Sequence, residues 1–267
     1  MKNVFLGVLF ILGVITTQAQ SKEQEAANAN NPLANIKAFN IQFNFLSNNT
    51  STDNQTMMTS FRYAQPVGKF LLRATLPTLT SSSPSLNSSM SGVGDFNLFA
   101  TYLASKSDSP VQFGIGPMVY APTSSVSADG PAFQDSNFGA NNWQVGAAAI
   151  VFVAKNPKFQ YGGLVTYVAG VGQDSVTKTS ADESLLAIQP FYFFQLGKGT
   201  YLRGAPIWTI NMQNDAVNLP VGIGLGQVMK IGNDVVNLFI EPQYSMYSKG
   251  FNQAMFQVFA SINLQFY

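Results

Sequence analysis

The last fifteen residues of the chain, 253–267, read QAMFQVFASINLQFY. Every second residue from Ala254 to Phe266 is apolar, and the residues between them are mostly polar. A period of two indicates a β-strand whose two faces meet different surroundings. The run is much longer than the strands of about 5–6 residues that are usual in globular proteins, and a tilted strand of roughly 9–11 residues can span a bilayer. The stretch therefore predicts the closing strand of a transmembrane β-barrel.

The composition of the 267-residue chain agrees with a barrel. Charged residues make up 10% and aromatic residues 13%, and the net charge is +1. So few charges are unusual for a soluble protein, yet membrane helices would need apolar runs of about 18 residues or more. A barrel that is apolar outside and polar inside lies between these two limits. The near-neutral charge gives no indication of a nucleic-acid partner.

Two residue types are missing, and their absence narrows the chemistry. The chain contains neither histidine nor cysteine, so it lacks disulfides, the main zinc ligands and the usual base of a nucleophilic triad. A Ser–Lys pair or a carboxylate dyad remains possible in principle, but no pair of carboxylates stands out. We therefore expect no cofactor, no metal and no enzymatic activity.

The N-terminal part divides into two segments. Residues 1–19 combine Lys2, a short apolar run and a small-residue site at Ala19, which together predict a signal peptide. Residues 20–37 predict a short helix that ends before Asn31-Pro32. This segment is either a polar periplasmic leader or a small plug. Residues 38–267 are expected to form the barrel.

The period of two continues through that whole region and predicts an all-β, antiparallel, up-and-down barrel of about twelve strands. The eighth predicted strand is apolar on both faces, which leaves its phase undetermined. The predicted strands are 39–45, 56–64, 69–76, 93–103, 111–120, 143–153, 159–169, 185–196, 200–210, 218–230, 235–244 and 253–267.

The connections between these strands alternate in length. The short ones carry Gly, Pro and Asn turn chemistry, and the long ones are rich in Ser, Asn, Asp and Thr. An even strand number places both chain ends on the periplasmic side, so the long connections face outward. The long connections are 46–55, 77–92, 121–142, 170–184, 211–217 and 245–252, and the short ones are 65–68, 104–110, 154–158, 197–199 and 231–234.

Two partners follow from this assignment, the lipid bilayer and the barrel-assembly machinery. The terminal pair Phe266 and Tyr267 is the predicted assembly signal, and Phe266 ends the lipid-facing phase. Aromatic residues near the strand ends predict interfacial girdles. On the periplasmic side these are Tyr161, Phe191, Tyr192, Tyr201, Phe266 and Tyr267, and on the outer side Trp143, Trp208, Tyr244 and Tyr247.

Polar residues on the opposite phase are candidates for the lumen lining. An arginine that faces lipid at mid-bilayer costs about 2–4 kcal/mol, so the strand charges are expected to point inward. They either form a constriction that selects permeants by charge or fill the barrel as satisfied ion pairs. The lumen candidates are Arg62, Arg73, Asp95, Arg203, Glu241 and Gln243.

Three glycines share one phase of the tenth predicted strand: Gly222, Gly224 and Gly226. The spacing is not a nucleotide-binding fingerprint, and it lies within a strand rather than at a strand–helix turn. We expect these glycines to face the lumen, where small residues leave room or let another segment approach the wall closely.

Several short motifs occur in a fixed order along the mature chain. They include Asn31-Pro32-Leu33-Ala34, Gly92-Val93-Gly94-Asp95, Gly114-Ile115-Gly116-Pro117, Tyr161-Gly162-Gly163-Leu164-Val165 and Pro220-Val221-Gly222-Ile223-Gly224. In these motifs the chain resembles the outer-membrane family labelled "MetA-pathway of phenol degradation". The resemblance implies a twelve-stranded barrel related to outer-membrane carriers of aromatic and fatty compounds.

These observations predict an outer-membrane channel or carrier for passive uptake of small hydrophobic or aromatic molecules. The alternative is a structural or binding barrel with a closed lumen and functional surface loops, among which residues 121–142 form the longest connection. A secreted soluble lipid-binding barrel is a third possibility.

Overall fold

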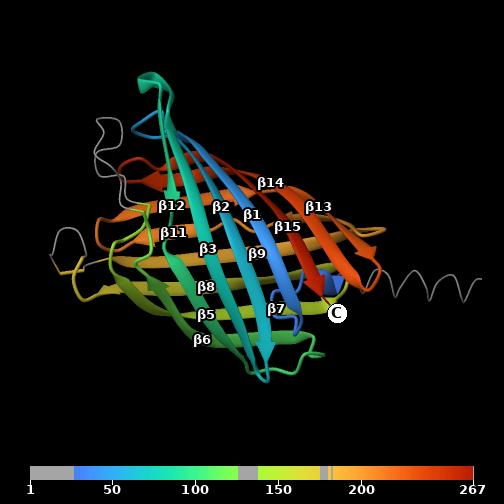
Figure 1. The fold of residues 1–267 in the computed structure, drawn as a ribbon. Helices are drawn as coiled ribbons and strands as arrows, with labels where there is room; N and C mark the ends of the chain where they lie inside the picture. Colours follow the sequence, from blue (N-terminus) through green and yellow to red (C-terminus); the bar gives the residue numbers. More distant parts are fainter. Residues whose placement is uncertain (1–26, 126–137, 175–179, 182, 267) are drawn as a thin grey trace, which may run out of the picture.

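A computed structural model describes residues 27–125, 138–174, 180–181 and 183–266. The segment predicted as a signal peptide, residues 20–26 and Tyr267 lie outside these ranges. The strands form one closed antiparallel barrel of twelve wall strands (Figure 1), which confirms the predicted fold class. In the described part of the chain, no helix has the length and apolar character needed to cross a membrane.

Nine wall strands are continuous. They are β1 (Lys37–Asn49), β2 (Gln55–Val67), β3 (Phe70–Ser83), β6 (Val111–Ala121), β7 (Trp143–Asn156), β8 (Phe159–Val171), β9 (Ser184–Gly197), β14 (Asp234–Lys249) and β15 (Ala254–Phe266). The other three each consist of two segments: β4 (Ser88–Val93) with β5 (Phe96–Leu103), β10 (Thr200–Gly204) with β11 (Trp208–Asn211), and β12 (Ala216–Gly222) with β13 (Gly224–Ile231). The continuous strands predicted at 200–210 and 218–230 are therefore wrong in this detail.

The barrel closes where the sequence predicted it. β15 pairs with β1 from Lys37↔Phe266 to Asn49↔Ala254, and its other edge pairs with β14. Neither edge of the last strand is left open. Full closure removes the exposed edges that a bilayer cannot satisfy by hydrogen bonding.

Several strands extend beyond their predicted ends. The predicted long connections 46–55, 77–92 and 245–252 shrink to 50–54, 84–87 and 250–253, because the flanking residues continue the ladders. The largest difference is a hairpin of β3 and β4 around the 3-10 turn η1 (Pro84–Leu86), which rises above the rest of the barrel in Figure 1. Ser and Thr in this hairpin hide the strand from a period-based prediction, because both faces meet water and the apolar–polar alternation stops.

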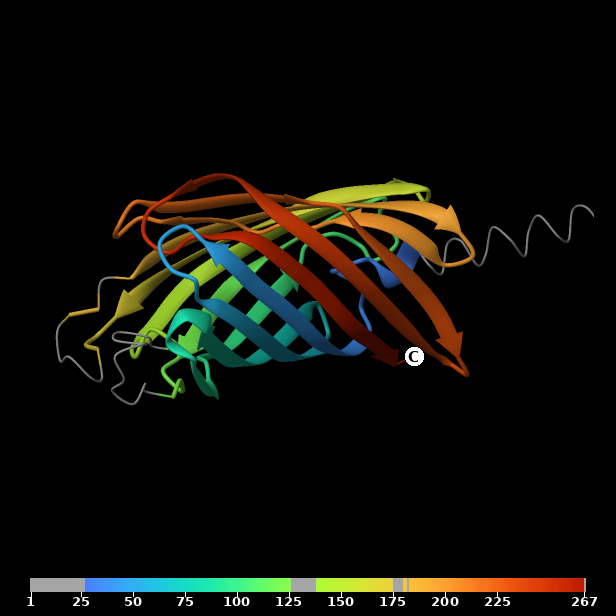
Figure 2. The same cartoon turned by 90° about the horizontal axis from the view of Figure 1, so that it is seen from above.

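Four of the five predicted tight turns are confirmed, whereas the β5–β6 connection is a seven-residue loop, 104–110. β2–β3, β7–β8, β9–β10 and β13–β14 are each joined by two residues. Gly68 and Gly232 take positive φ values of 59° and 64° in these turns, a conformation that favours glycine. Figure 2 shows the C-terminal end near the same barrel end as the β9–β10 and β13–β14 turns, with η1 toward the opposite end.

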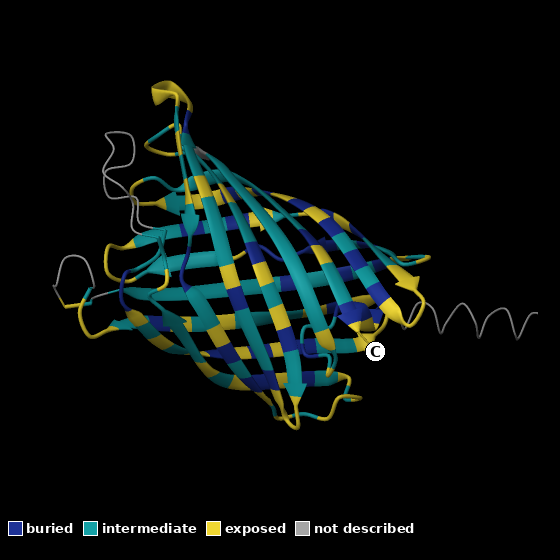
Figure 3. Ribbon diagram, viewed as in Figure 1, coloured by how far each residue is buried: buried dark blue, intermediate teal, exposed yellow. Residues whose placement is uncertain are grey.

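The outer wall is apolar, and the inner wall carries most of the polar strand residues beside one apolar cluster. Phe61 and Tyr63 of β2 are 40% and 44% exposed, whereas Ser60, which precedes Phe61 on the same strand, is 7% exposed. β14 alternates in the same way, with Ile240 exposed and Glu241 fully buried. Figure 3 shows this alternation of buried and exposed positions along the strands. An apolar outer surface with a polar interior is the pattern of a barrel surrounded by lipid.

Candidate lumen site

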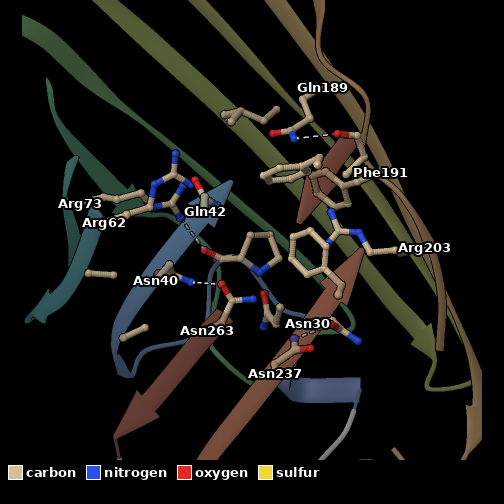
Figure 4. A pocket seen from close by; sticks show the side chains of 18 of the residues that line it. Asn30, Asn40, Gln42, Arg62, Arg73, Gln189, Phe191, Arg203, Asn237 and Asn263 are labelled. Atoms are coloured by element: carbon tan, nitrogen blue, oxygen red, sulfur yellow. Dashed lines mark hydrogen bonds between the residues drawn. The ribbon is translucent and has the colours of Figure 1, made fainter. Parts of the chain in front are cut away.

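A cavity of about 330 Å³ lies inside the barrel. One side carries amide and guanidinium groups, and Phe191 and Arg203 lie on the other side (Figure 4). Amide side chains of β1, β14 and β15 line the cavity, and β9 adds Gln189. Those of the first three strands are Asn40, Gln42, Asn44, Asn237, Gln243, Gln257, Asn263 and Gln265. In β1, β14 and β15 these positions belong to the polar phase that the sequence places inward.

Arg62 and Arg73 lie together on this polar side (Figure 4). They are diagonal neighbours on one face, because Arg62 pairs with Thr75 and Arg73 pairs with Ala64. Arg62 donates from Nε to the Thr75 hydroxyl at 3.2 Å, and Arg73 donates from Nη2 to the Pro32 carbonyl at 3.0 Å. In the described part of the chain, neither arginine has a carboxylate partner.

Arg203 and Glu241 form a buried ion pair instead. Arg203 Nε lies 2.7 Å from Glu241 Oε2, and the two side chains are 7% and 0% exposed. Glu241 Oε1 also accepts hydrogen bonds from Ala205 N and from Gln243 Nε2, both at 2.8 Å. The guanidinium carbon of Arg203 lies 3.4 Å from the centre of the Phe239 ring, in a cation–π contact. This carboxylate is therefore fully used within the wall.

The glycines of β12 and β13 make this pairing possible. Arg203 on β10 lies opposite Gly224 on β13, and a Cβ on Gly224 would lie 2.7 Å from Glu241 Cβ on the next strand. Tyr201 lies opposite Gly226 in the same way, and its hydroxyl donates to Asn237 Oδ1 on β14 at 2.6 Å. Because these glycines have no side chain, side chains of β10 reach β14 across β13.

The N-terminal segment of the described chain lies inside the barrel. The Ala29 carbonyl accepts a hydrogen bond from Gln265 Nε2 of β15 at 2.8 Å, and Asn31 Nδ2 donates to Gln112 Oε1 of β6 at 3.0 Å. The Pro32 carbonyl also accepts a hydrogen bond from Arg73 of β3, so β3, β6 and β15 all hold this segment. Leu33 is 3% exposed in the inner apolar cluster. The predicted helix end before Asn31-Pro32 is confirmed, because residues 27–29 are helical and residue 31 is not.

The aromatic side of the cavity comes from β9, the strand whose phase the sequence left undetermined. Phe191 and Phe193 are each 7% exposed, and they form an apolar cluster with Ile150, Phe152 and other inner residues. The expectation that Phe191 and Tyr201 belong to an interfacial girdle is therefore wrong. Both rings point inward: the Tyr201 hydroxyl donates to Asn237 Oδ1 there, and Phe191 packs against the rings of Phe152 and Phe193.

The wall is interrupted where β10 gives way to β11 and β12 to β13, and side chains replace the missing ladder bonds. Gln189 Nε2 donates to the Ala205 carbonyl at 3.0 Å, and Trp208 Nε1 donates to the Pro220 carbonyl at 2.9 Å. Pro206 in the same gap has no N–H to satisfy. Within a bilayer an unpaired backbone group costs several kcal/mol, so these bonds let the wall depart from regular pairing.

Asp95 does not join the other charges at the cavity. It is 6% exposed between β4 and β5, and it accepts hydrogen bonds from Ser124 N at 3.1 Å and Ala140 N at 2.7 Å. It therefore anchors both ends of the long β6–β7 connection. The five strand charges do not form one cluster: two arginines face the cavity together, one ion pair is closed, and Asp95 holds a loop.

A second acidic residue acts within the outer connections. Asp53 accepts a hydrogen bond from Ser85 N at 2.6 Å and another from Ser83 Oγ at 3.2 Å. The hydrogen bonds from Ser85 hold the pKa of the exposed Asp53 carboxyl below its usual value. These contacts tie the β1–β2 connection to the β3–β4 hairpin.

Phe266, the described member of the predicted assembly signal, is the last residue of β15 and is 41% exposed on the outer face. Its role in an assembly signal stays a prediction. Among the described residues, no group of three or more acidic side chains has the arrangement of a metal site.

No protein-family model matches the chain, and no curated protein sequence matches it. The resemblance to the family labelled "MetA-pathway of phenol degradation" therefore stays a prediction.

Solved structures do share this architecture. A COG4313 outer membrane channel from Pseudomonas putida F1 superposes with a TM-score of 0.69 at 14% identity, covering 87% of this chain and 96% of the other. The NanC porin superposes with a TM-score of 0.53 at 11% identity, covering 86% and 99%. At these identities the likeness establishes a shared barrel fold.

Proposed function

We propose that this protein is an outer-membrane channel through which small hydrophobic or aromatic molecules cross passively. The observation that carries the proposal is the lumen cavity of about 330 Å³, which lies inside a closed barrel with an apolar outer wall. A volume of this order matches the pockets that hold small organic ligands, about 300–1,000 Å³. The shared fold with an outer membrane channel and a porin supports the same assignment.

The lining of the cavity supports the class of molecule. Phe191, Phe193, Leu71, Ile150 and Leu164 offer apolar surface inside the lumen. A lumen for fully hydrated solutes would be lined by polar groups throughout, whereas aromatic rings stabilise an aromatic guest by offset or edge-to-face stacking. The N-terminal segment narrows the remaining passage, so we propose a selective conduit rather than a wide pore.

The proposal is tested with purified, heat-modifiable protein in planar bilayers and by isothermal titration calorimetry. Benzamide serves as the probe because it is aromatic, uncharged and soluble. We expect discrete conductance steps and saturable binding of benzamide. The Ala205→Trp variant, whose larger side chain would fill the cavity, should lose this binding. A folded protein that shows neither conductance nor binding contradicts the proposal and favours a structural barrel with a closed lumen.

A further inference from the structure

The arginine pair at the cavity has no acidic counterpart in the described chain. Arg62 and Arg73 occupy one face of adjacent strands, so their positive charges repel each other. The carboxylate of the other lumen ion pair, Glu241, is already bound to Arg203. Both arginines are half-buried at the cavity, and a cation that loses water without gaining a counter-charge destabilises a fold. Binding of an anionic ligand would supply the missing counter-charge and stabilise the two arginines.

Among the described residues, the two guanidinium groups use few of their donors. Each arginine carries five N–H groups in a planar fork, and within that part of the chain Arg62 bonds to Thr75 and Arg73 to the Pro32 carbonyl. Within the described residues, the Nδ2 group of Asn30 on the same cavity has no hydrogen-bond partner either, although Asn30 is 8% exposed. Charge and donors therefore both favour an oxyanion, and the guanidinium fork matches the flat shape of a carboxylate.

The opposite side of the cavity supplies the complementary surface. Arg62 and Arg73 lie on β2 and β3, and Phe191 lies on β9, across the barrel in the strand order. Arg203 lies near Phe191, but its charge is neutralised by Glu241 and its face is covered by Phe239. The cavity is thus polar and cationic at one end and aromatic at the other.

We propose that the cavity binds organic carboxylates, with the carboxylate on Arg62 and Arg73 and an aromatic or short aliphatic body against Phe191 and Phe193. This inference rests on the proposed function and specifies its substrate class. The arginine pair neutralises the charge of the ligand while its apolar body leaves water. The same pair disfavours cations of similar size, so the lumen selects by charge as well as by hydrophobicity.

The test compares benzoate with benzamide, which have nearly the same shape and differ in charge. Both are titrated calorimetrically into the full-length protein in a non-ionic detergent. We expect benzoate to bind at least about tenfold more tightly than benzamide, as a charge-assisted hydrogen bond is roughly twice as strong as a neutral one. Equal affinities for the two ligands overturn the inference and leave the proposed channel standing.

Variants then locate the charge effect. R62Q/R73Q keeps amide donors at both positions, and we expect it to lose the benzoate preference, so that benzoate and benzamide bind with similar affinity. K158Q, which removes an exposed positive charge at a turn, is the matched control and should keep the preference. A retained preference in R62Q/R73Q overturns the inference. Should the double variant fail to fold, the single variants R62Q and R73Q and the wild-type ligand comparison still decide the question.

Discussion

Replacing Glu241 with alanine should destabilise the barrel more than any other single removal of a charge. Glu241 is fully buried and accepts three hydrogen bonds, from Arg203, Ala205 N and Gln243. Its loss leaves the Arg203 charge unpaired in the wall, which typically costs about 3–5 kcal/mol. The orphaned backbone N–H of Ala205 belongs to the same penalty, since an unsatisfied buried donor costs about 1–3 kcal/mol.

A double variant separates these contributions. R203M/E241L replaces the ion pair with apolar side chains, a change that is often nearly neutral for buried pairs, but it still leaves Ala205 N without its acceptor. We therefore expect it to lose only about 1–3 kcal/mol, less than E241A alone. E241Q keeps an oxygen acceptor for Ala205 N and should fall between the wild type and E241A.

Urea unfolding in detergent measures these differences, with Trp143 and Trp208 as fluorescent reporters. K249Q is the matched control, because it breaks the Lys249–Asp215 pair, which is 56% and 80% exposed, and exposed pairs contribute little. E241A should lower the free energy of unfolding strongly and K249Q should leave it unchanged. An E241A loss below about 1 kcal/mol, the range of a solvated pair, would refute the reasoning.

Three further predictions concern other parts of the barrel. G226V should lower the free energy of unfolding by about 1–3 kcal/mol through overpacking, because a Cβ at this position collides with the buried Tyr201 ring. G163A is the control, because its Cβ would lie 3.7 Å from the nearest atom, and it should unfold like the wild type in the same urea titration. Deletion of residues 20–36 removes the segment that is hydrogen-bonded to β3, β6 and β15 inside the barrel. Single-channel conductance should therefore rise. An unchanged conductance would show that this segment does not limit the passage. Deletion of Phe266 and Tyr267 removes the end of the lipid-facing phase of β15 and should reduce the amount of protein assembled in the outer membrane, measured by fractionation and heat modifiability; normal levels would contradict the assembly-signal hypothesis.

The faces of most strands could be read from local sequence. In β1, β2, β14 and β15 the apolar residues alternate with amides or charges, and the structure places the polar set inward. Lipid on one side and a wet lumen on the other impose opposite demands on neighbouring residues, so a period of two carries the answer. The same pattern fails in β9, where Phe191 and Phe193 face inward beside equally apolar neighbours.

The interruptions of β10–β13 were beyond local reasoning. Pro206 and Pro220 are compatible with an edge or a bulge, but whether a wall strand breaks there depends on acceptors and donors from other strands. Trp208 supplies a donor to the Pro220 carbonyl, and Glu241 supplies an acceptor to Ala205 N from a residue 36 positions away. The partners of the second bond are too far apart for a local window of sequence to contain both.

By itself, the sequence predicted the closed antiparallel barrel of twelve strands and its closure by the last strand, Ala254–Phe266. Each of these follows from a repeating preference of single residues for lipid or water. Only the tertiary structure decided which charges meet. Arg203 reaches Glu241 because Gly224 between them lacks a side chain, while Arg62 and Arg73 are left without a carboxylate among the described residues. Pairing of side chains across a barrel depends on strand register and on the side chains that lie between them. The alternation of residues along one strand carries no information about either.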